Sequence, residues 1–353
     1  MSSLKEKLKR AIALTGPISV AEYMAQCLLD PEYGYYTTRE PFGTQGDFIT
    51  APEVSQMFGE LIGVWIFTAW QAAGSPAQPV VAEIGPGRGT LMKDLLRAVS
   101  RLDPGFVRQT RFALVEASPR LVEVQKATLA NSSASPEWYS RFEDLPEAPL
   151  FIVGNELFDA LPIRQFVKTP SGWREHMVGL DQNGELAFFA GVASLDAALL
   201  PADAATAPEG AIFETAPARE ALMDDIAVRL KQHGGAGLFI DYGFDKTAVG
   251  DTLQAMKSHA YNDVLANPGE ADITSHVDFD ALARISRRHG LAYTLTTQGE
   301  FLLQLGLLER AGQLGAGKPV EVQESIRDAV ERLAAPDQMG TLFKVLTVTA
   351  KRR

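Results

Sequence analysis

The sequence of 353 residues is poor in the residue types that build covalent cross-links and metal centres. It contains one cysteine, Cys27, so no framework of disulfides can form within the chain. We expect Cys27 to be a small, buried apolar side chain. The five histidines show no spacing typical of metal ligands, and one cysteine adds no further ligand set. The sequence therefore predicts no metal site.

Long apolar runs and excess positive charge are also missing. No run reaches the roughly 18 apolar residues that a membrane-spanning helix needs, and the N-terminal residues resemble neither a signal peptide nor a transit segment. The formal net charge is −11, whereas a surface that binds the phosphate backbone of a nucleic acid should be basic. The sequence therefore predicts a bacterial cytoplasmic protein without membrane insertion or bound nucleic acid. Its acidity mildly favours a basic protein as partner.

Three glycines, Gly85, Gly87 and Gly89, alternate directly after an apolar strand expected over residues 80–84. An amphipathic helix is expected over residues 90–102. Glycines at such a turn let the backbone bend sharply and approach a ligand closely, and the following helix offers free N–H groups and a positive dipole end. This arrangement indicates a ligand site at the mouth of a parallel sheet.

The spacing of the glycines distinguishes between ligands. The dinucleotide fingerprint is G-x-G-x-x-G, but Thr90 occupies the place of its third glycine, which disfavours a nicotinamide-dependent oxidoreductase. Glu83 stands two residues before the first glycine, and Glu116 ends the next apolar strand, expected over residues 111–116. This pattern resembles the first two motifs of class I S-adenosyl-L-methionine-dependent methyltransferases.

The resemblance implies S-adenosyl-L-methionine as cofactor and assigns roles to several residues. The turn of Gly85, Gly87 and Gly89, with Glu83 beside it, would lie under the methionine part of the cofactor. Glu116 would bind both ribose hydroxyls. Asn155, which follows another apolar strand, is either a further contact to cofactor or substrate or a turn residue.

Alternating strands and helices predict an α/β fold, a doubly wound Rossmann-like sheet of the class I methyltransferase type. Residues 1–75 are expected to form an N-terminal helical extension, and residues 76–353 the core. Antiparallel strands of period two begin at residue 163, so we expect insertions at 163–210 and 244–277 to form a smaller substrate-docking subdomain. Within them, 191–210 is interpreted as a flexible connection and 244–277 as loop-rich. The last strand, 341–348, is expected at the antiparallel edge of the sheet.

Two sequence patterns in the N-terminal extension indicate helix starts. Ser19 with Glu22, and Thr50 with Glu53, have the spacing of capping boxes. Between them, the aromatic and glycine-rich segment 33–53 is either a lid over the cofactor or an ordered surface loop.

Seven segments together identify a more specific resemblance, to the MidA-like methyltransferase family. They are residues 47–53 (DFITAPE), 83–90 (EIGPGRGT), 155–162 (NELFDALP), 241–243 (DYG), 267–274 (NPGEADIT), 276–279 (HVDF) and 339–346 (MGTLFKVL). Mitochondrial members of that family are respiratory complex I assembly factors that symmetrically dimethylate an arginine on a core subunit. The resemblance implies a protein arginine N-methyltransferase, with a complex I subunit as a possible substrate.

Arginine methylation requires acids beside the transferred methyl group. A guanidinium is a poor nucleophile because its lone pairs are delocalised, and carboxylates that bind two of its nitrogens orient it and localise its charge. Glu156 and Asp159, after the strand at 150–154, and Asp241, after the strand at 237–241, are the expected catalytic residues. The alternative for each is structural: Glu156 and Asp159 would satisfy N–H groups at a helix start, and Asp241 would make a buried hydrogen bond.

Two further functions stay open at the level of the sequence. The chain is either an enzyme or a non-catalytic assembly chaperone that uses a methyltransferase fold. A small-molecule methyltransferase is the other alternative, although the long insertions favour a protein substrate.

Overall fold

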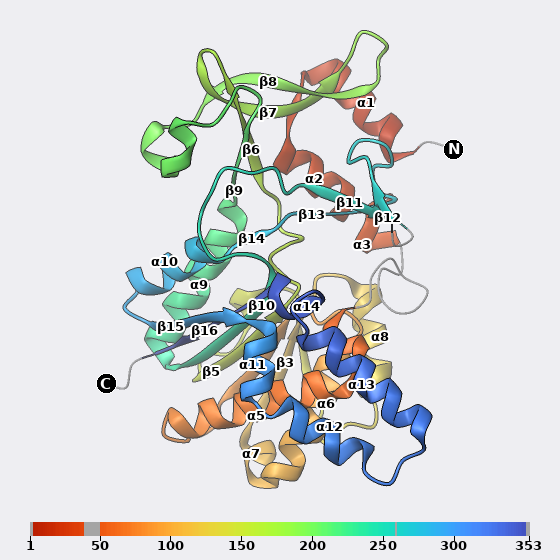
Figure 1. Ribbon diagram of the computed structural model, residues 1–353, viewed down its shortest axis with the longest axis vertical. Coiled ribbons are helices and arrows are strands. Elements are labelled where there is room, and N and C mark those ends of the chain that lie inside the picture. Colours follow the sequence, from red (N-terminus) through yellow and green to blue (C-terminus); the bar gives the residue numbers. More distant parts are fainter. Residues whose placement is uncertain (1–2, 39–49, 258–259, 351–353) are drawn as a thin grey trace.

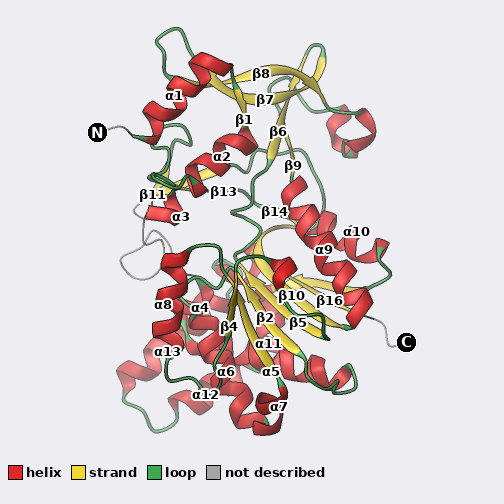
Figure 2. Ribbon diagram, turned by 180° about the vertical axis from the view of Figure 1, so that it is seen from behind, coloured by secondary structure: helices red, strands yellow, loops and turns green. Residues whose placement is uncertain are grey.

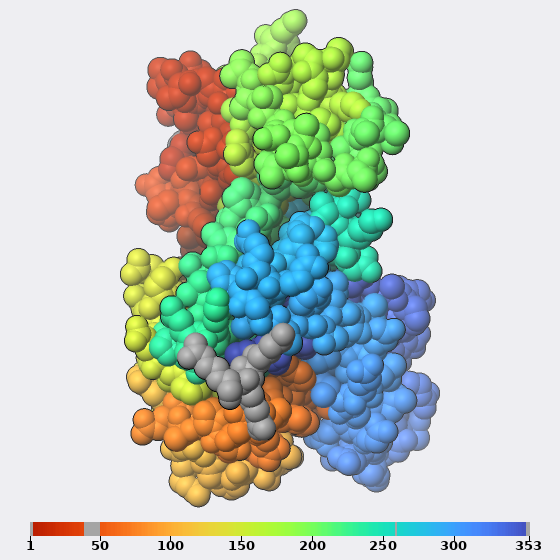
Figure 3. All heavy atoms as spheres, turned by 90° about the vertical axis from the view of Figure 1, so that its left-hand side faces the viewer, coloured from red at the N-terminus to blue at the C-terminus, as the bar shows by residue number. Residues whose placement is uncertain are grey.

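The computed structural model describes residues 3–38, 50–257 and 260–350. An α/β core forms the lower part of the molecule in Figure 1, and a smaller β-rich part lies above it. The N-terminal helices are in the smaller part, beside the inserted strands (Figure 3).

The core is built on a sheet of order β15-β16-β10-β5-β2-β3-β4, with short β14 also paired to β10. The run from β10 to β4 is parallel, and β16 is antiparallel to both of its neighbours. This is the class I methyltransferase arrangement. The strands are β2 (Val80–Ile84), β3 (Arg111–Val115), β4 (Glu137–Tyr139), β5 (Leu150–Asn155), β10 (Gly235–Phe244), β14 (Val277–Asp278), β15 (Ala292–Thr297) and β16 (Phe343–Thr349).

The last strand of the chain is not at the edge of the sheet, so that expectation was wrong. Strand β16 lies between β10 and β15, and β15 forms the edge. Its apolar residues Val345, Leu346 and Val348 are fully buried. An inner position buries both faces of the strand, which explains the nearly continuous apolar run.

Helices cover both faces of the core sheet (Figure 2). Successive residues of β2 point to opposite sides: Val81 packs with α5 and α6, whereas Val80 and Ala82 pack with α9 and α10. The core helices are α4 (Ala51–Val54), α5 (Gln56–Ala72), α6 (Thr90–Leu102), α7 (Pro104–Gln109), α8 (Pro119–Leu129), η1 (Phe142–Asp144), α9 (Pro217–His233), α10 (Phe279–Arg288), α11 (Gln298–Gln304), α12 (Leu307–Gly315), α13 (Val320–Ala334) and α14 (Met339–Leu342).

Helices begin after both expected caps, Ser19 and Thr50, but only the first forms a capping box. The capping box of Ser19 and Glu22 is present at α2. Thr50 makes no side-chain cap, and Ser55 instead caps α5 by accepting from the backbone N–H of Met57. The side chain of Glu53 turns toward α6, where its Oε1 accepts from Thr90 Oγ1. A competing side-chain partner thus replaced the second capping box.

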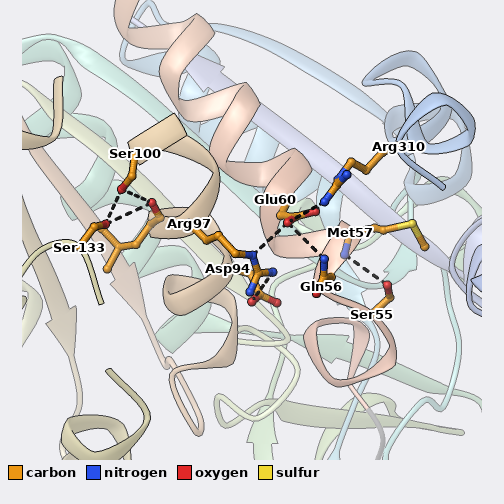
Figure 4. A network of polar contacts seen from close by, with 10 residues as sticks. Ser55, Gln56, Met57, Glu60, Asp94, Arg97, Ser100, Ser133 and Arg310 are labelled. Atoms are coloured by element: carbon orange, nitrogen blue, oxygen red, sulfur yellow. Dashed lines mark hydrogen bonds and ion pairs between the residues drawn. The ribbon is translucent and has the colours of Figure 1, made fainter. Parts of the chain in front are cut away.

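A buried carboxylate joins three helices of the core (Figure 4). Glu60 on α5 accepts from Arg97 Nε on α6 at 3.0 Å and from Arg310 Nε on α12 at 2.7 Å. Arg97 also pairs with Asp94 at 2.8 Å. The network fixes α6 against α5 and α12. Helix α6 begins directly after the three glycines.

The smaller part contains a five-stranded antiparallel sheet of order β1-β7-β6-β9, with β8 on β7. Helices α1 and α2 pack on it, whereas α5 packs on the core. Elements of this part are α1 (Leu4–Thr15), β1 (Ile18–Ser19), α2 (Val20–Leu29), α3 (Tyr35–Thr38), β6 (Arg164–Thr169), β7 (Gly172–Leu180), β8 (Leu186–Ser194), η2 (Ala197–Leu199), η3 (Ala202–Ala205) and β9 (Ile212–Thr215).

Two stretches interpreted as irregular contain regular structure. Residues 191–210 include the end of β8 and two short 3-10 helices, and Ala204 in the second of them is buried. Residues 244–277 contain a three-stranded sheet of β11 (Gln254–Lys257), β12 (Ala260–Asn262) and β13 (Asp272–Thr274). These strands are too short for a period of two to be visible in the sequence.

Candidate active site

The carboxyl ends of β2, β3, β5 and β10 open into a cavity of about 650 Å³ that also reaches α3 and β13. A smaller cavity of about 50 Å³ adjoins it under the glycine turn. Thr50, Gly85, Gly87 and Glu156 line both. The ligand site therefore lies at the sheet edge that the strand order predicts.

The glycine turn has the backbone conformation for which glycine is required. Gly85, Gly87 and Gly89 have φ angles of 64°, 50° and 81°. Gly89 is the N-cap of α6 and lies against Gln125 rather than at the wall of either cavity. Gln125 donates to Gly87 O at 2.8 Å and to Glu116 Oε2 at 3.0 Å. This fully buried glutamine, which the sequence did not single out, joins the turn to the acid that follows β3.

Glu116 lies at the wall of the larger cavity, next to the start of α8. Its Oε1 accepts from the backbone N–H of Ser118 at 2.7 Å. Burial raises its pKa, and the hydrogen bonds from Ser118 and Gln125 oppose that shift. The carboxylate is thus held in one orientation at the cavity wall, as binding of a diol requires.

Two buried oxygens at the smaller cavity have no hydrogen-bond partner among the described residues: Oε2 of Glu83 and Oδ1 of Asn155. Burial raises the pKa of Glu83 to about 8. Buried acceptors without donors are costly, so this end of the site suits a ligand group that only donates, such as an ammonium. The methionine part of S-adenosyl-L-methionine carries that group.

Glu156 follows β5 with a φ of 49°, in the left-handed region that favours glycine. Its Oε1 accepts from Asn155 Nδ2 at 3.0 Å and from the backbone N–H of Ala51 at 3.3 Å. Burial and then the charge of Asp159 raise its pKa to about 7. A strained backbone that aims a carboxylate at a cavity is typical of a functional residue.

Asp159 shares the cavity wall with Glu156, so the structure brings this pair together. Its Oδ2 accepts from the hydroxyl of Tyr242 at 2.7 Å, and its Oδ1 has no hydrogen-bond partner within the described residues. The residue is 6% exposed. Burial raises its pKa, opposed by the hydrogen bond from Tyr242 and the charge of Arg219.

Asp241 is fully buried beneath the turn and is not brought to the cavity wall with the other two acids. Its Oδ2 accepts from the backbone N–H groups of Phe158 and Asp159, at 2.9 and 3.1 Å, and its Oδ1 from that of Tyr242 at 3.0 Å. The side chain thus fixes the loop that carries Asp159. Burial and the charges of Asp159 and Glu156 raise its pKa well above the ordinary range.

Arg219, at the start of α9, also holds this loop and was not foreseen. It is 2% exposed and donates to the carbonyls of Asp159 and Leu161 and, on the other side, to His276 O and Ser275 Oγ. Nothing in the local sequence separates it from the other charged residues of an exposed helix. Tyr242 had a signal, since it directly follows Asp241 in a segment that carries the family resemblance.

The segment 33–53, interpreted as a lid or a surface loop, falls partly outside the described residues, at 39–49. Tyr36, Thr37 and Thr50, which flank that gap, line the larger cavity. Within the described parts of the chain, no three or more His, Cys, Asp or Glu side chains are grouped to hold a metal. None of the described helices is long and apolar enough to cross a membrane.

Comparison with known proteins decides the family. A family model described as "Putative S-adenosyl-L-methionine-dependent methyltransferase" matches residues 61–297, more than half of the chain. The chain belongs to this methyltransferase family. It is therefore an S-adenosyl-L-methionine-dependent methyltransferase, as the glycine motif indicated.

Relatives and a solved structure agree along nearly the whole chain. The "Protein arginine methyltransferase NDUFAF7, mitochondrial" of Danio rerio is 35% identical and covers 98% of the chain and 86% of its own length. The Homo sapiens protein of that name is 34% identical, with 97% and 82% covered. A Burkholderia thailandensis crystal structure bound to S-adenosyl-homocysteine is 30% identical, with a TM-score of 0.85 over 99% of this chain and 92% of that one. The class I fold and the cofactor predicted from the sequence are thereby confirmed.

Proposed function

We propose that this methyltransferase modifies an arginine of a protein substrate, with symmetric dimethylation as the product. The observation that carries the proposal is the pair of carboxylates, Glu156 and Asp159, at one wall of the cavity. The names of the relatives support the arginine as the target. A small-molecule substrate would leave the long insertions between core strands without a role.

In the proposed mechanism, Glu156 and Asp159 bind the guanidinium and hold one nitrogen toward the cofactor. The bound cofactor supplies an activated methyl group on a sulfonium. Positioning is the main contribution of the protein to such a transfer, together with stabilisation of charge. Asp241 and Arg219 act as positioning residues, because both bind the backbone of the loop that carries Asp159.

We assign the cofactor contacts along the two cavities. Glu83 and Asn155 accept from the methionine ammonium, and the backbone at Gly85 and Gly87 lies beside it. Glu116 binds the ribose hydroxyls. Gly89 and Gln125 support the turn from behind.

The substrate is proposed to dock on the smaller part, with the insertions 163–210 and 244–277 as its binding surface. A respiratory complex I subunit is the proposed substrate, by resemblance to the assembly factors. A bacterial cytoplasmic location stays a prediction from the sequence, since the relatives named above are mitochondrial proteins.

Glu156→Gln tests the proposal. We expect this variant to bind S-adenosyl-homocysteine as the wild type does and to lose methyl transfer by about 10²–10³-fold, because the neutral amide cannot bind the guanidinium as an anion. Incorporation of radiolabelled methyl groups into a lysate of cells that lack the gene measures transfer. Amino-acid analysis of the product then distinguishes symmetric dimethylarginine from other methylated residues.

Glu324→Gln, an exposed change of the same type on α13, is the matched control. Unchanged transfer by Glu156→Gln would refute the catalytic role. A chaperone function would appear as rescue of a cellular assembly defect by Glu156→Gln. Label confined to small molecules would refute the protein substrate.

A further inference from the structure

Two tyrosine–aspartate pairs are among the residues that line the larger cavity. The hydroxyl of Tyr242 donates to Asp159 at 2.7 Å. The hydroxyl of Tyr36 donates to both oxygens of Asp272, at 3.1 and 3.2 Å. Each hydroxyl holds its carboxylate in a fixed orientation.

The two pairs come from different parts of the fold. Tyr242 lies in β10 and Asp159 follows β5 of the core, whereas Tyr36 lies on α3 and Asp272 on β13 of the smaller part. They are nevertheless near one another, because the backbone N–H of Ser275, three residues after Asp272, donates to Asp159 O at 3.2 Å. Consistent with this, burial and then the negative charges of Asp272 and Asp159 raise the pKa of Tyr36 well above its ordinary value. The carboxylates of Asp159 and Asp272 therefore act on the same region of the cavity.

The charged side chains that line this cavity are mostly acidic, and the buried guanidinium of Arg219 lies behind the loop of Asp159. Its described lining includes four acids, Glu116, Glu156, Asp159 and Asp272. Arg120 is the basic residue among the described lining side chains, and its charge acts on Glu116. Asp159 and Asp272 are 6% and 5% exposed, so water screens them little. Such a field favours a cation over a neutral group of the same shape.

One buried carboxylate oxygen in this cavity also lacks a hydrogen-bond donor among the described residues. Asp159 Oδ1 is buried and accepts no hydrogen bond from any described residue. Both neighbouring tyrosine hydroxyls already donate to carboxylates, at 2.7 Å for Tyr242 and 3.1 Å for Tyr36. A group that brings several donors and no acceptor would fill this deficit. Arginine has five N–H donors in a planar fork, whereas lysine has a compact ammonium.

We propose that Asp159 and Asp272, each held by a tyrosine, form a cation clamp that binds the guanidinium of the substrate together with Glu156. Asp272 and Tyr36 are then specificity-determining residues contributed by the smaller part, which explains why the cavity is completed by an insertion. The clamp rests on the proposed function, because it presumes that the methylated group is a guanidinium.

Binding of small probes to the protein loaded with S-adenosyl-homocysteine tests the clamp without knowledge of the protein substrate. The probes are Nα-acetyl-arginine amide, the lysine analogue, and the neutral citrulline analogue. We expect the arginine probe to bind more tightly than the other two in an NMR titration. Asp272→Asn should weaken its binding at least about tenfold, because one of the charged acceptors for the guanidinium is lost, while affinity for S-adenosyl-homocysteine stays unchanged.

Matched controls and a milder variant separate recognition from folding. Asp225→Asn, on exposed α9 surface, and Tyr261→Phe, 78% exposed on β12, should bind the arginine probe as the wild type does. Tyr36→Phe removes a single hydroxyl and should lower the affinity for the arginine probe by a few-fold. Asp272→Glu should recover part of the affinity lost in Asp272→Asn, which a purely structural role would not predict.

The possible failures are distinguishable. Equal binding of the arginine probe by wild type and Asp272→Asn would overturn the clamp, even if wild-type enzyme still produced dimethylarginine. Equal binding of the citrulline and arginine probes would also overturn it. Preference for the arginine probe, lost in Asp272→Asn, together with no methylated arginine in the product of the wild type, would support the clamp and refute the proposed product.

Discussion

Glu156 combines backbone strain with a carboxylate that is costly to ionise. A non-glycine residue at a φ of 49° is rarely retained unless its surroundings enforce it. Here the amide of Asn155 and the N–H of Ala51 both bind Oε1. The residue therefore directs a negative charge into the cavity at a conformational cost, which is consistent with its proposed part in binding a cationic nucleophile.

The raised pKa of Glu156 predicts the pH dependence of the reaction. Because this pKa is about 7 and only the ionised form binds the guanidinium as an anion, kcat/KM should rise as pH increases through about 7. The charge of Asp159 contributes to the shift, so the residual activity of Asp159→Asn should rise at a lower pH. Initial rates between about pH 5.5 and 8.5 measure both profiles. A profile that is flat over this range, or an Asp159→Asn limb at higher pH, would contradict the assignment.

Sequence and structure agree best where local spacing determines geometry. Gly85 and Gly87 were predictable because the turn needs their positive φ angles and no longer-range information. The Tyr36–Asp272 pair was not, because 236 residues separate the partners and only the folded chain places them together. Asp241 resembled Glu156 and Asp159 in sequence, at the end of a strand, but its backbone partners are visible only in the structure.

Helices α5, α6 and α12 are joined by the charge network around Glu60. The contribution of this network to the stability of the fold can be measured. Burial alone would raise the pKa of Glu60, but hydrogen bonds from Arg310 and Arg97 outweigh burial and lower it. Because the pKa of Glu60 is lower in the folded protein than in the unfolded chain, ionised Glu60 stabilises the fold. This contribution is fully present above the unfolded pKa of about 4.3 and is lost as pH falls through the pKa of the folded protein.

Glu60→Gln should therefore lower the free energy of unfolding by about 1.5–3 kcal/mol at pH 7, because two arginines lose their charged acceptor. The difference from the wild type should shrink as pH falls below the unfolded pKa of about 4.3 and on through the lowered pKa of folded Glu60. Urea unfolding at neutral pH and in a series of acidic buffers below that pKa measures it, with Glu324→Gln as control. A difference independent of pH would show that the charge of Glu60 does not stabilise the fold.

The strands and helices of the core could be predicted from the sequence more completely than those of the two insertions. Strands β2, β3 and β5 have continuous apolar runs, and α6 has a strong amphipathic pattern between a glycine turn and β3. The helical stretch after β15 is divided into α11 and α12 at Gly306, whose φ is 90°. The inner position of β16 depends on pairing with both β10 and β15, which a linear pattern cannot specify.

At the scale of the whole molecule, the cavity is enclosed by both parts of the chain. The core supplies the glycine turn and Glu116, and the smaller part supplies Tyr36 and Asp272. N-terminal and inserted segments share one apolar cluster, and Tyr23 of α2 donates to Val264 O at 2.7 Å. We infer that this part acts as a unit that completes the site for the substrate, while the core alone binds the cofactor.

The central claim is that the glycine turn binds S-adenosyl-L-methionine, and calorimetric titration with S-adenosyl-homocysteine tests it most directly. Wild type should bind with micromolar affinity and should not bind NAD. Gly87→Val should abolish binding, because a branched side chain is strained at a φ of 50° and projects where the backbone approaches the ligand. Gly210→Val places the same strain, at a φ of 83°, in a turn with open space around it and should still bind. No binding by the wild type, or undiminished binding by Gly87→Val, would contradict the account.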